Sequence, residues 1–317
     1  MAGPNLILAD DLAAQTSTGR KRSRLLQDNA IQLAQKLKLN LEIVFVADLK
    51  PSWFKNENLN FIMSEFDGIR SQVLKRMKKS QVTAKLDLKY GIPAEEILAA
   101  TKSAADCRML IMGTQGKKGL KKLLLGSVAE EVIRNASLPV FVLGPVAQEK
   151  NRIINFRKEL NVLFLTDFSS SSISAEKFLM NFSKEVPTSV QMVHSIGEQV
   201  LKIKESFYQT GAIPFDLEKM FSQMSDDAYR DLQRTVQRWE KNGLKINFKL
   251  LTREAHLEDS LRGLLDEADL VVMGTHGRNM VLRAFLGSIA RRIILKSPAP
   301  VIVIRANNTT PRSGAKK

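Results

Sequence analysis

The feature that most constrains this chain is an internal repeat. Residues 112–127 read MGTQGKKGLKKLLLGS, and residues 273–288 read MGTHGRNMVLRAFLGS. Both follow the pattern Gly-x2-Gly-x9-Gly-Ser, although most side chains between the glycines differ. NLILADD at 5–11 likewise resembles NVLFLTD at 161–167, and the two offsets are 161 and 156 residues. Landmarks repeated in one order at nearly one spacing indicate two copies of a domain of ordinary size.

Each copy alternates short apolar runs with amphipathic segments. In the first half the expected strands are NLILAD, LEIVFVADL, AKLDLKYG, RMLIMG and PVFVLGP, and the second half repeats the order from NVLFLTD to PVIVIR. Strands that alternate with helices predict a parallel sheet covered on both faces, and right-handed crossovers favour an open, doubly wound form. The predicted fold class is therefore α/β, with two tandem Rossmann-like domains.

The repeat also sets the expected domain boundaries. We expect one domain over residues 1–146, a second over residues 158–306, and a flexible basic tail over residues 307–317. The stretch near 196–228 is longer than its first-half counterpart. A lid, a partner surface and a longer helix remain open as explanations for it.

The net charge of +15 favours an anionic partner. The basic residues are scattered, however, and aromatics make up only 6% of the chain. A lysine-rich solvated surface therefore explains the charge equally well, and nucleic acid is disfavoured as a partner. No apolar run approaches the roughly 20 residues of a membrane span, so no membrane partner is expected. The single cysteine, Cys107, fits a reducing compartment, and we expect a cytoplasmic protein.

The repeated glycines point to a phosphate site. Gly113 and Gly274 follow an expected strand, whereas Gly126 and Gly287 precede an expected helix. Ligands of open parallel sheets bind beyond the carboxyl ends of the strands, and a helix N-terminus attracts anions. A glycine would let a phosphate approach the backbone, and the serine after it could cap the helix and offer a hydroxyl. Because main-chain atoms would hold the ligand, the side chains between the glycines could vary.

An aspartate ends the first strand of each half. Asp11 and Asp167 should lie near the glycine turn, because the first and fourth strands of a doubly wound sheet are neighbours. Their carboxylates suit hydrogen bonds to a ribose or to a base edge. A helix N-cap is the alternative role for each aspartate.

At these motifs the chain resembles the universal stress protein family. GTQG…GS and GTHG…GS each follow an apolar strand and precede a Pro-Val-x-Val segment, and the resemblance covers both halves. It implies a five-stranded parallel sheet of order 3-2-1-4-5 in each half, and it implies binding of ATP, with or without Mg²⁺. It also implies that the halves pair as a pseudo-dimer through their fifth strands, and a homodimer of whole chains stays open.

The resemblance assigns nucleotide contacts to matching positions in both halves, and it assigns no catalytic residue and no metal ligand. The positions are Asp11, Val46, Gly113, Gly116, Gly126, Ser127, Asp167, Gly274, Gly277, Gly287 and Ser288. Ser195 is the second-half counterpart of Val46. One departure is that YGIPAEE keeps the Gly-x-Pro that this family often has before the third helix, whereas TREAHLEDS lacks it.

Charges in the helix after each glycine loop predict unequal sites. In the first half, SVAE would form a capping box with Glu130, whose charge would compete with a phosphate. In the second half, Arg291 takes that place and would favour a phosphate. Lysines inside the first loop could compensate, namely Lys117, Lys118, Lys121 and Lys122. We expect both halves to bind and the second half to bind more tightly.

Three functions remain open from the sequence. The favoured one is an ATP-binding regulatory stress-response protein with slow or no hydrolysis. The second is a slow ATPase or nucleotidyl-transfer enzyme. The third is a scaffold whose glycine turns are structural and whose basic surface binds a partner.

Overall fold

The fold is described from a computed structural model of the chain. The structure describes the following residues: 6–12, 17–47, 56–104, 106–114, 124–210, 216–252, 257–276 and 286–306. The expected tail at 307–317 lies outside them. Among the described residues, no helix combines the length and the apolar character that crossing a bilayer needs.

The first half alternates strands and helices along the chain. Its strands are β1 (Leu6–Ala9), β2 (Leu41–Ala47), β3 (Ala84–Tyr90), β4 (Met109–Gly113) and β5 (Val140–Leu143). Its helices are α1 (Ser17–Leu37), α2 (Asn56–Lys79), α3 (Pro93–Ser103), α4 (Ser127–Asn135) and the short α5 (Pro145–Glu149). The central strands are apolar and buried along their length, as strands covered on both faces must be.

The second half repeats this alternation, with two helices in each of two connections between strands. Its strands are β6 (Leu160–Leu165), β7 (Thr188–Ser195), β8 (Lys245–Leu251), β9 (Leu270–Gly274) and β10 (Val301–Ile304). Its helices are α6 (Ser170–Glu185), α7 (Gly197–Thr210), α8 (Leu217–Glu240), α9 (Leu257–Ser260), α10 (Arg262–Glu267) and α11 (Ser288–Lys296). Helix α7 accounts for the longer stretch near 196–228.

The strands form one continuous sheet across both halves. The sheet has ten strands in the order β3-β2-β1-β4-β5-β10-β9-β6-β7-β8. Each half reads 3-2-1-4-5 from its outer edge to the middle, and its strands are parallel. The halves meet where β5 and β10 pair antiparallel, with Phe141 opposite Ile302. The two fifth strands therefore cover each other's edges, which would otherwise be exposed to further strand pairing.

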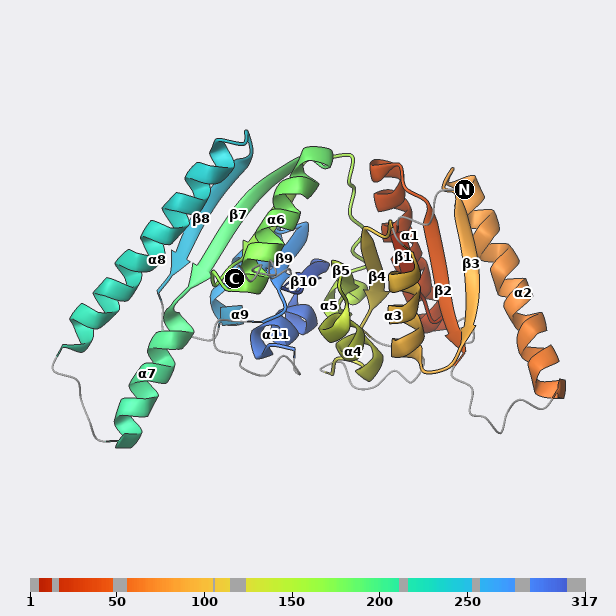
Figure 1. Cartoon of the computed structure of the whole chain (residues 1–317), viewed down its shortest axis with the longest axis horizontal. Helices are drawn as coiled ribbons and strands as arrows, with labels where there is room; N and C mark the ends of the chain where they lie inside the picture. Colours follow the sequence, from red (N-terminus) through yellow and green to blue (C-terminus); the bar gives the residue numbers. More distant parts are fainter. Residues whose placement is uncertain are drawn as a thin grey trace, which may run out of the picture.

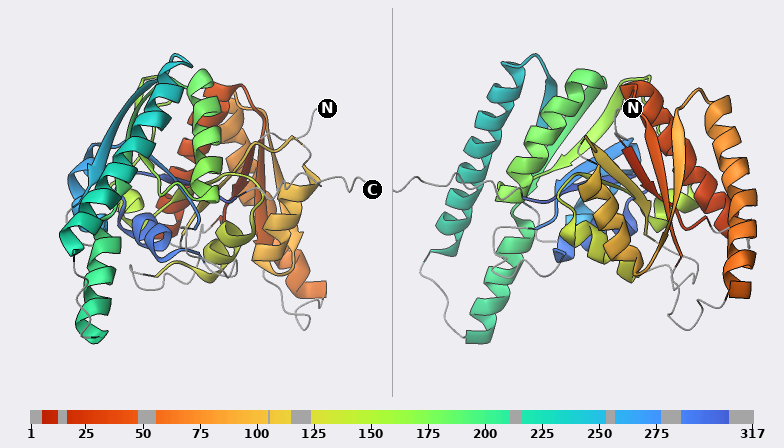
Figure 2. Two further views of the ribbon diagram at one scale, coloured as in Figure 1. Left: turned by 60° about the vertical axis from the view of Figure 1, so that its left-hand side comes forward. Right: turned by 45° about the vertical axis from the view of Figure 1, so that its right-hand side comes forward.

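Helices cover both faces of the sheet, and two long helices, α2 and α8, lie at its two ends. One buried cluster joins the sheet to α1, α2, α6 and α8, and the other joins it to α3, α4, α9, α10 and α11. Figure 1 shows α2 and α8 at opposite ends of the molecule, and it shows α7 projecting from the second half. The turned views in Figure 2 show the same projection of α7 beyond the body.

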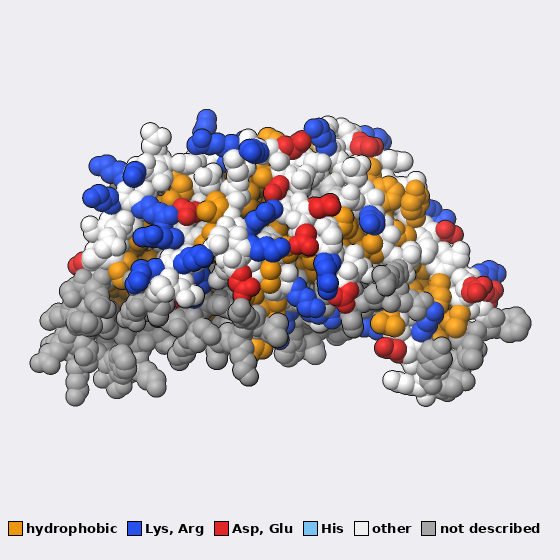
Figure 3. Space-filling view, turned by 180° about the vertical axis from the view of Figure 1, so that it is seen from behind, with side chains coloured by type: hydrophobic (Ala, Val, Ile, Leu, Met, Phe, Trp, Pro, Cys, Tyr) orange, Lys and Arg blue, Asp and Glu red, His pale blue; other side chains and the backbone are white. Residues whose placement is uncertain are grey.

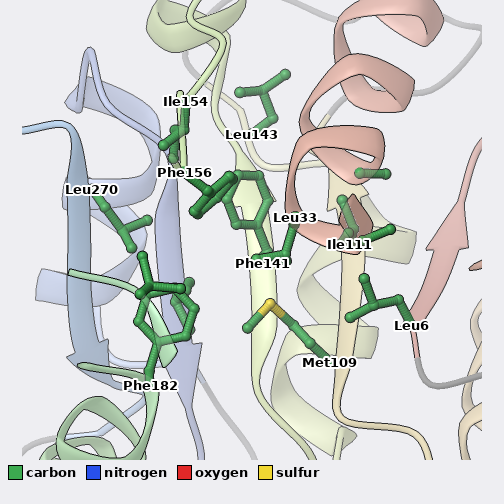
Figure 4. Packing of buried hydrophobic residues seen from close by; sticks show 14 of the residues in the cluster. Leu6, Leu33, Met109, Ile111, Phe141, Leu143, Ile154, Phe156, Phe182 and Leu270 are labelled. Atoms are coloured by element: carbon green, nitrogen blue, oxygen red, sulfur yellow. The ribbon is translucent and has the colours of Figure 1, made fainter. Parts of the chain in front are cut away.

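The segment between the halves is part of the core. Ile154 and Phe156 are buried there, and the ring of Phe156 meets the ring of Phe182 from α6 edge-on, with their centroids 6.4 Å apart. Figure 4 shows Phe156 between Phe141 of β5 and Leu270 of β9. The buried cluster therefore runs across the junction of the halves.

Candidate functional site

A pocket lies at the carboxyl ends of the second-half strands. Its volume is about 260 Å³, just under the usual range of about 300–1,000 Å³ for small-molecule sites. Its lining comes from the ends of β6, β7 and β9, from the start of α11, and from α7 and α9. The lining residues are Leu165, Thr166, Asp167, Ser172, Val193, Ser195, Gln199, Lys202, Leu257, Met273, Gly274, Thr275, His276, Gly287, Ser288, Ile289 and Ala290.

The pocket combines an apolar wall with a polar side. Leu165, Val193 and Met273 lie side by side near the carboxyl ends of three neighbouring strands, and all three residues are buried. Asp167 lies two residues beyond Leu165, after the end of β6, and Ser195 lies two residues beyond Val193, at the end of β7. A flat ring with hydrogen-bonding edges suits such a surface, since its face can pack on the apolar side chains while its edge meets polar groups.

The turn after β6 fixes the carboxylate of Asp167. Phe168 has a φ of 59°, in the left-handed region, and the turn brings the N–H of Ser169 to Asp167 Oδ1 at 3.0 Å. The hydroxyl of Ser172 donates to the same oxygen at 2.6 Å. Ser169 itself caps α6, because its side chain accepts from the N–H of Ser172. The alternative role of N-cap is therefore wrong for Asp167, and its carboxylate stays at the pocket wall.

Two of the motif glycines, Gly126 and Gly287, are required by the chain's own packing. The N–H of Gly287 donates to Thr275 O at 3.0 Å, and a Cβ on Gly287 would lie 3.0 Å from that same oxygen. In the first half the N–H of Gly126 donates to Thr114 O at 2.9 Å, and a Cβ there would lie 2.8 Å from it. A valine at either glycine would force the turn open, so lost binding would not isolate a phosphate contact.

The start of α11 faces the pocket with Ser288, Ile289 and Ala290. The first N–H groups of a helix have no partner within the helix, and together with the helix dipole they favour an anion. The expected capping by serine is wrong, because Gly287 and Gly126 hold the N-cap positions and neither helix start has a side-chain cap. Ser288 and Ser127 begin the helices as exposed residues.

Helices α4 and α11 are joined by an ion pair between their charged side chains. Arg291 of α11 donates to the carboxylate of Glu130 of α4 across the junction of the halves. The expected capping box is therefore wrong, because the Glu130 side chain pairs with Arg291 and not with the helix start. The reasoning from helix-end charges also fails at these residues, because each charge balances the other and neither is left to act on a phosphate alone.

His276 belongs to the wall that joins β9 to α6. Its backbone oxygen accepts from the hydroxyls of Ser171 at 2.6 Å and Ser169 at 3.1 Å. Its ring Nδ1 lies 2.7 Å from the hydroxyl oxygen of Thr275. These bonds tie the start of the second glycine motif to the start of α6, next to Asp167.

Asp11, the first-half counterpart of Asp167, forms an ion pair. Arg22 of α1 donates to Asp11 Oδ2 at 2.6 Å, and the Arg22 side chain is only 9% exposed. The neighbouring Asp10 is buried and accepts from Ser23 Oγ at 2.6 Å and from Gln27 Nε2 at 3.0 Å. The two aspartates in sequence therefore have different partners, and both are held by α1.

The other predicted residues of the first half are placed as follows. Val46 is partly buried near the end of β2, and Gly113 ends β4. A Cβ on Gly113 would lie 3.3 Å from the end of the Leu26 side chain, a tight contact that a small shift of this flexible side chain would relieve. Gly116 and Gly277, and the four loop lysines, lie outside the described residues.

Sequence reasoning missed the contribution of α7 and α9. Gln199 and Lys202 come from α7, and Leu257 begins α9. The inserted length at 196–228 was the available signal, but length alone does not tell which residues face a pocket.

Two features outside the pocket are the thiol of Cys107 and the basic surface of the first half. Burial raises the pKa of the Cys107 thiol to about 11, which makes it a packing group and a poor nucleophile at neutral pH. Lys and Arg side chains gather at the left of Figure 3, on the side of the first half. Helix α1 of that half exposes Arg20, Lys21 and Arg24.

Comparison with known proteins identifies the universal stress protein family. A model of the universal stress protein family matches residues 18–144 and 160–305. A universal stress protein of Methanocaldococcus jannaschii is 36% identical over 128 residues, covering 36% of this chain and 71% of that protein. One from Synechocystis is 23% identical over 303 residues, covering 87% of this chain and 93% of that protein. The crystal structure of a universal stress protein from Archaeoglobus fulgidus superposes with a TM-score of 0.68 at 18% identity, covering 96% and 99% of the two chains.

Proposed function

Because the chain belongs to the universal stress protein family, with a copy of the family domain in each half, we propose that it is a regulatory stress-response protein that binds ATP with slow or no hydrolysis. The observation that carries this proposal is the second-half pocket. There a carboxylate, an apolar wall and a helix N-terminus surround one cavity. These are the three features that a ribose, a base and a phosphate chain require.

The residues suggest how ATP would lie. The base would pack on Leu165, Val193 and Met273, with Ser195 at its edge. Asp167 would accept a hydrogen bond from a ribose hydroxyl. The phosphates would extend toward Ser288 at the start of α11, where backbone N–H groups and the helix dipole favour negative charge. A pocket of about 260 Å³ would not enclose the whole nucleotide, so the phosphate chain would lie toward its open side.

The lining supports binding more than turnover. Among the described lining residues, Asp167 is the one carboxylate, and its Oδ1 accepts two hydrogen bonds that hold the turn. A general base must reach an attacking water in the right geometry. A single carboxylate also supplies too few ligands for a magnesium site, so Mg²⁺ would be coordinated mainly by the phosphates. The single cysteine agrees with our proposal of a cytoplasmic location.

The scaffold alternative has one observation in its favour, since the glycines serve backbone contacts of the chain itself. The pocket beside them favours a ligand, because a purely structural turn needs no polar cavity. The ATPase alternative requires steady product formation that depends on Asp167.

Titration calorimetry of the intact chain with ATP, together with a phosphate-release assay, separates these functions. We expect saturable ATP binding and less than one turnover over an hour-long incubation. Asp167→Asn should weaken binding at least tenfold, because a charged hydrogen-bond acceptor at the pocket wall is lost. Steady turnover that Asp167→Asn abolishes would support the enzyme. An intact, folded chain that gives no binding heat and retains no ATP in native mass spectrometry would support the scaffold.

A further inference from the structure

The junction of the two halves is organised around a local two-fold axis. From the glycine motif to the fifth strand the second half follows the first at an offset of 161 residues, so Phe141 and Ile302 are equivalent residues. They also lie directly opposite each other where β5 and β10 pair antiparallel. Two equivalent residues can face each other only at the centre of a two-fold arrangement. The axis therefore passes between Phe141 and Ile302.

The residues beside this central pair are alike in both halves. They are valines, namely Val140 and Val142 in β5 and Val301 and Val303 in β10. Because each valine faces a valine, these contacts would be unchanged if either half paired with a copy of itself. The strands at the junction would therefore not distinguish the other half from a copy if the central pair did not differ.

The central pair would change in such self-pairing. Phe141 and Ile302 are both buried in the cluster that runs across the junction, and Figure 4 shows Phe156 next to Phe141 there. Two first halves would bring together two phenyl rings, which overpack a space that one ring and one isoleucine fill. Two second halves would bring together two isoleucines, which leave that space underfilled. The observed pair of one large and one smaller side chain fits best.

A second pair of equivalent residues meets across the same axis. Glu130 of α4 and Arg291 of α11 are also 161 residues apart, and Arg291 donates to the Glu130 carboxylate. Self-pairing would place two carboxylates here in one case and two guanidinium groups in the other. The side chains are only 29% exposed for Glu130 and 43% exposed for Arg291, so solvent screens the repulsion incompletely.

We propose that the junction is a recognition surface that accepts the other half of the chain and excludes a second copy of the same half. Specificity of this kind is a difference between two binding free energies, and it needs contacts that penalise the wrong partner. Size at Phe141 and Ile302 and charge at Glu130 and Arg291 supply such contacts, and both favour the same pairing. An assembly of whole chains must therefore use another surface, or exchange unlike halves between two chains.

Substitutions in the full chain recreate each self-contact. Ile302→Phe with Arg291→Glu gives the contacts of two first halves, and Phe141→Ile with Glu130→Arg gives those of two second halves. The fourfold variant again has one phenylalanine, one isoleucine and one pair of opposite charges, with the halves exchanged. In calorimetric melting we expect each double variant to unfold at least about 3 °C below the wild type, and the fourfold variant to regain at least half of that loss.

The charge contribution is tested separately at two salt concentrations. Arg291→Glu alone and Glu130→Arg alone should each lower the Tm, and roughly 1 M salt should reduce both losses, because the Debye length is then about 3 Å. The matched control is Arg234→Glu, which makes the same change of charge at an exposed position of α8 and should shift the Tm by less than about 1 °C.

Every outcome decides the proposal. Double variants as stable as the wild type would show that the junction does not distinguish its partners, and the proposal would be wrong. A fourfold variant that regains nothing would show that these residues only pack, which also overturns it. If a double variant does not fold, the single charge variants and the pair Glu130→Arg with Arg291→Glu decide, and a loss that salt leaves unchanged or that the pair does not recover overturns the proposal. None of these results depends on ATP binding, so the proposed function stands or fails separately.

Discussion

Alanine at the two strand-ending glycines should have very different effects. At Gly274 an added Cβ would lie 2.4 Å from Ser171 Oγ and 2.8 Å from the backbone carbonyl carbon of Ser171. At Gly113 it would lie 3.3 Å from Leu26 Cδ1 and 3.5 Å from Gln148 Nε2, both ends of flexible side chains. The backbone at the start of α6 must therefore move for Gly274→Ala, whereas a rotation of side chains suffices for Gly113→Ala.

The magnitude follows from these contacts. Overpacking against backbone costs about 1–3 kcal/mol, and moving Ser171 also breaks its hydrogen bond to His276 O, worth about 1 kcal/mol. Gly274→Ala should thus lower the free energy of unfolding by about 2–4 kcal/mol, and Gly113→Ala by less than about 1 kcal/mol. The displaced start of α6 also carries Ser172, so Gly274→Ala should weaken ATP binding through Asp167.

Urea unfolding followed by tryptophan fluorescence measures the two losses, because Trp239 is fully buried. Gly68→Ala is the control, since nothing lies within 4 Å of its added Cβ and alanine favours the interior of α2. Equal losses for Gly113→Ala and Gly274→Ala, or no loss for Gly274→Ala, would refute the reasoning from close contacts.

Three further predictions concern the junction, the cysteine and an ion pair. Glu130→Arg should destabilise the chain by about 1 kcal/mol, and adding Arg291→Glu should restore most of that loss in a double-mutant cycle measured by urea unfolding. Because burial raises the pKa of Cys107 to about 11, iodoacetamide at pH 8 should alkylate it slowly in the folded chain and rapidly in denaturant; equal rates would contradict its burial. The hydrogen bond from Arg108 lowers the pKa of Glu185 below its ordinary 4.5, so the pair stabilises the fold above that pH and its contribution is lost as pH falls through the lowered pKa. Arg108→Ala should therefore lower the Tm near pH 7 and approach the wild type in acid, and a constant difference in Tm across the pH range would contradict this.

Much of the fold could be predicted from the sequence, because the order of strands and helices depends on local sequence patterns. Apolar runs such as NLILAD and NVLFLTD alternate with amphipathic segments, and this order leaves few topologies for a parallel sheet. The family resemblance is confirmed by the match of the family model to both halves. The second-half pocket also brings together Asp167, Gly274, Gly287 and Ser288, which the repeat had singled out.

The rest depends on contacts between distant segments. Arg22 is eleven residues from Asp11, and nothing in the spacing of DLAAQTSTGRKR indicates that one arginine of several would turn back to the strand end. Glu130 and Arg291 are 161 residues apart and meet only because the fifth strands pair antiparallel. The glycines looked like openings for a ligand, yet the oxygens closest to Gly126 and Gly287 belong to the chain's own threonines.

The most direct test of the account is a crystal structure of the full chain with a non-hydrolysable ATP analogue. The account predicts a nucleotide in the second half, with its base against Leu165, Val193 and Met273 and its phosphates at the start of α11 beside Ser288. A second-half pocket left empty at saturating analogue would contradict the account.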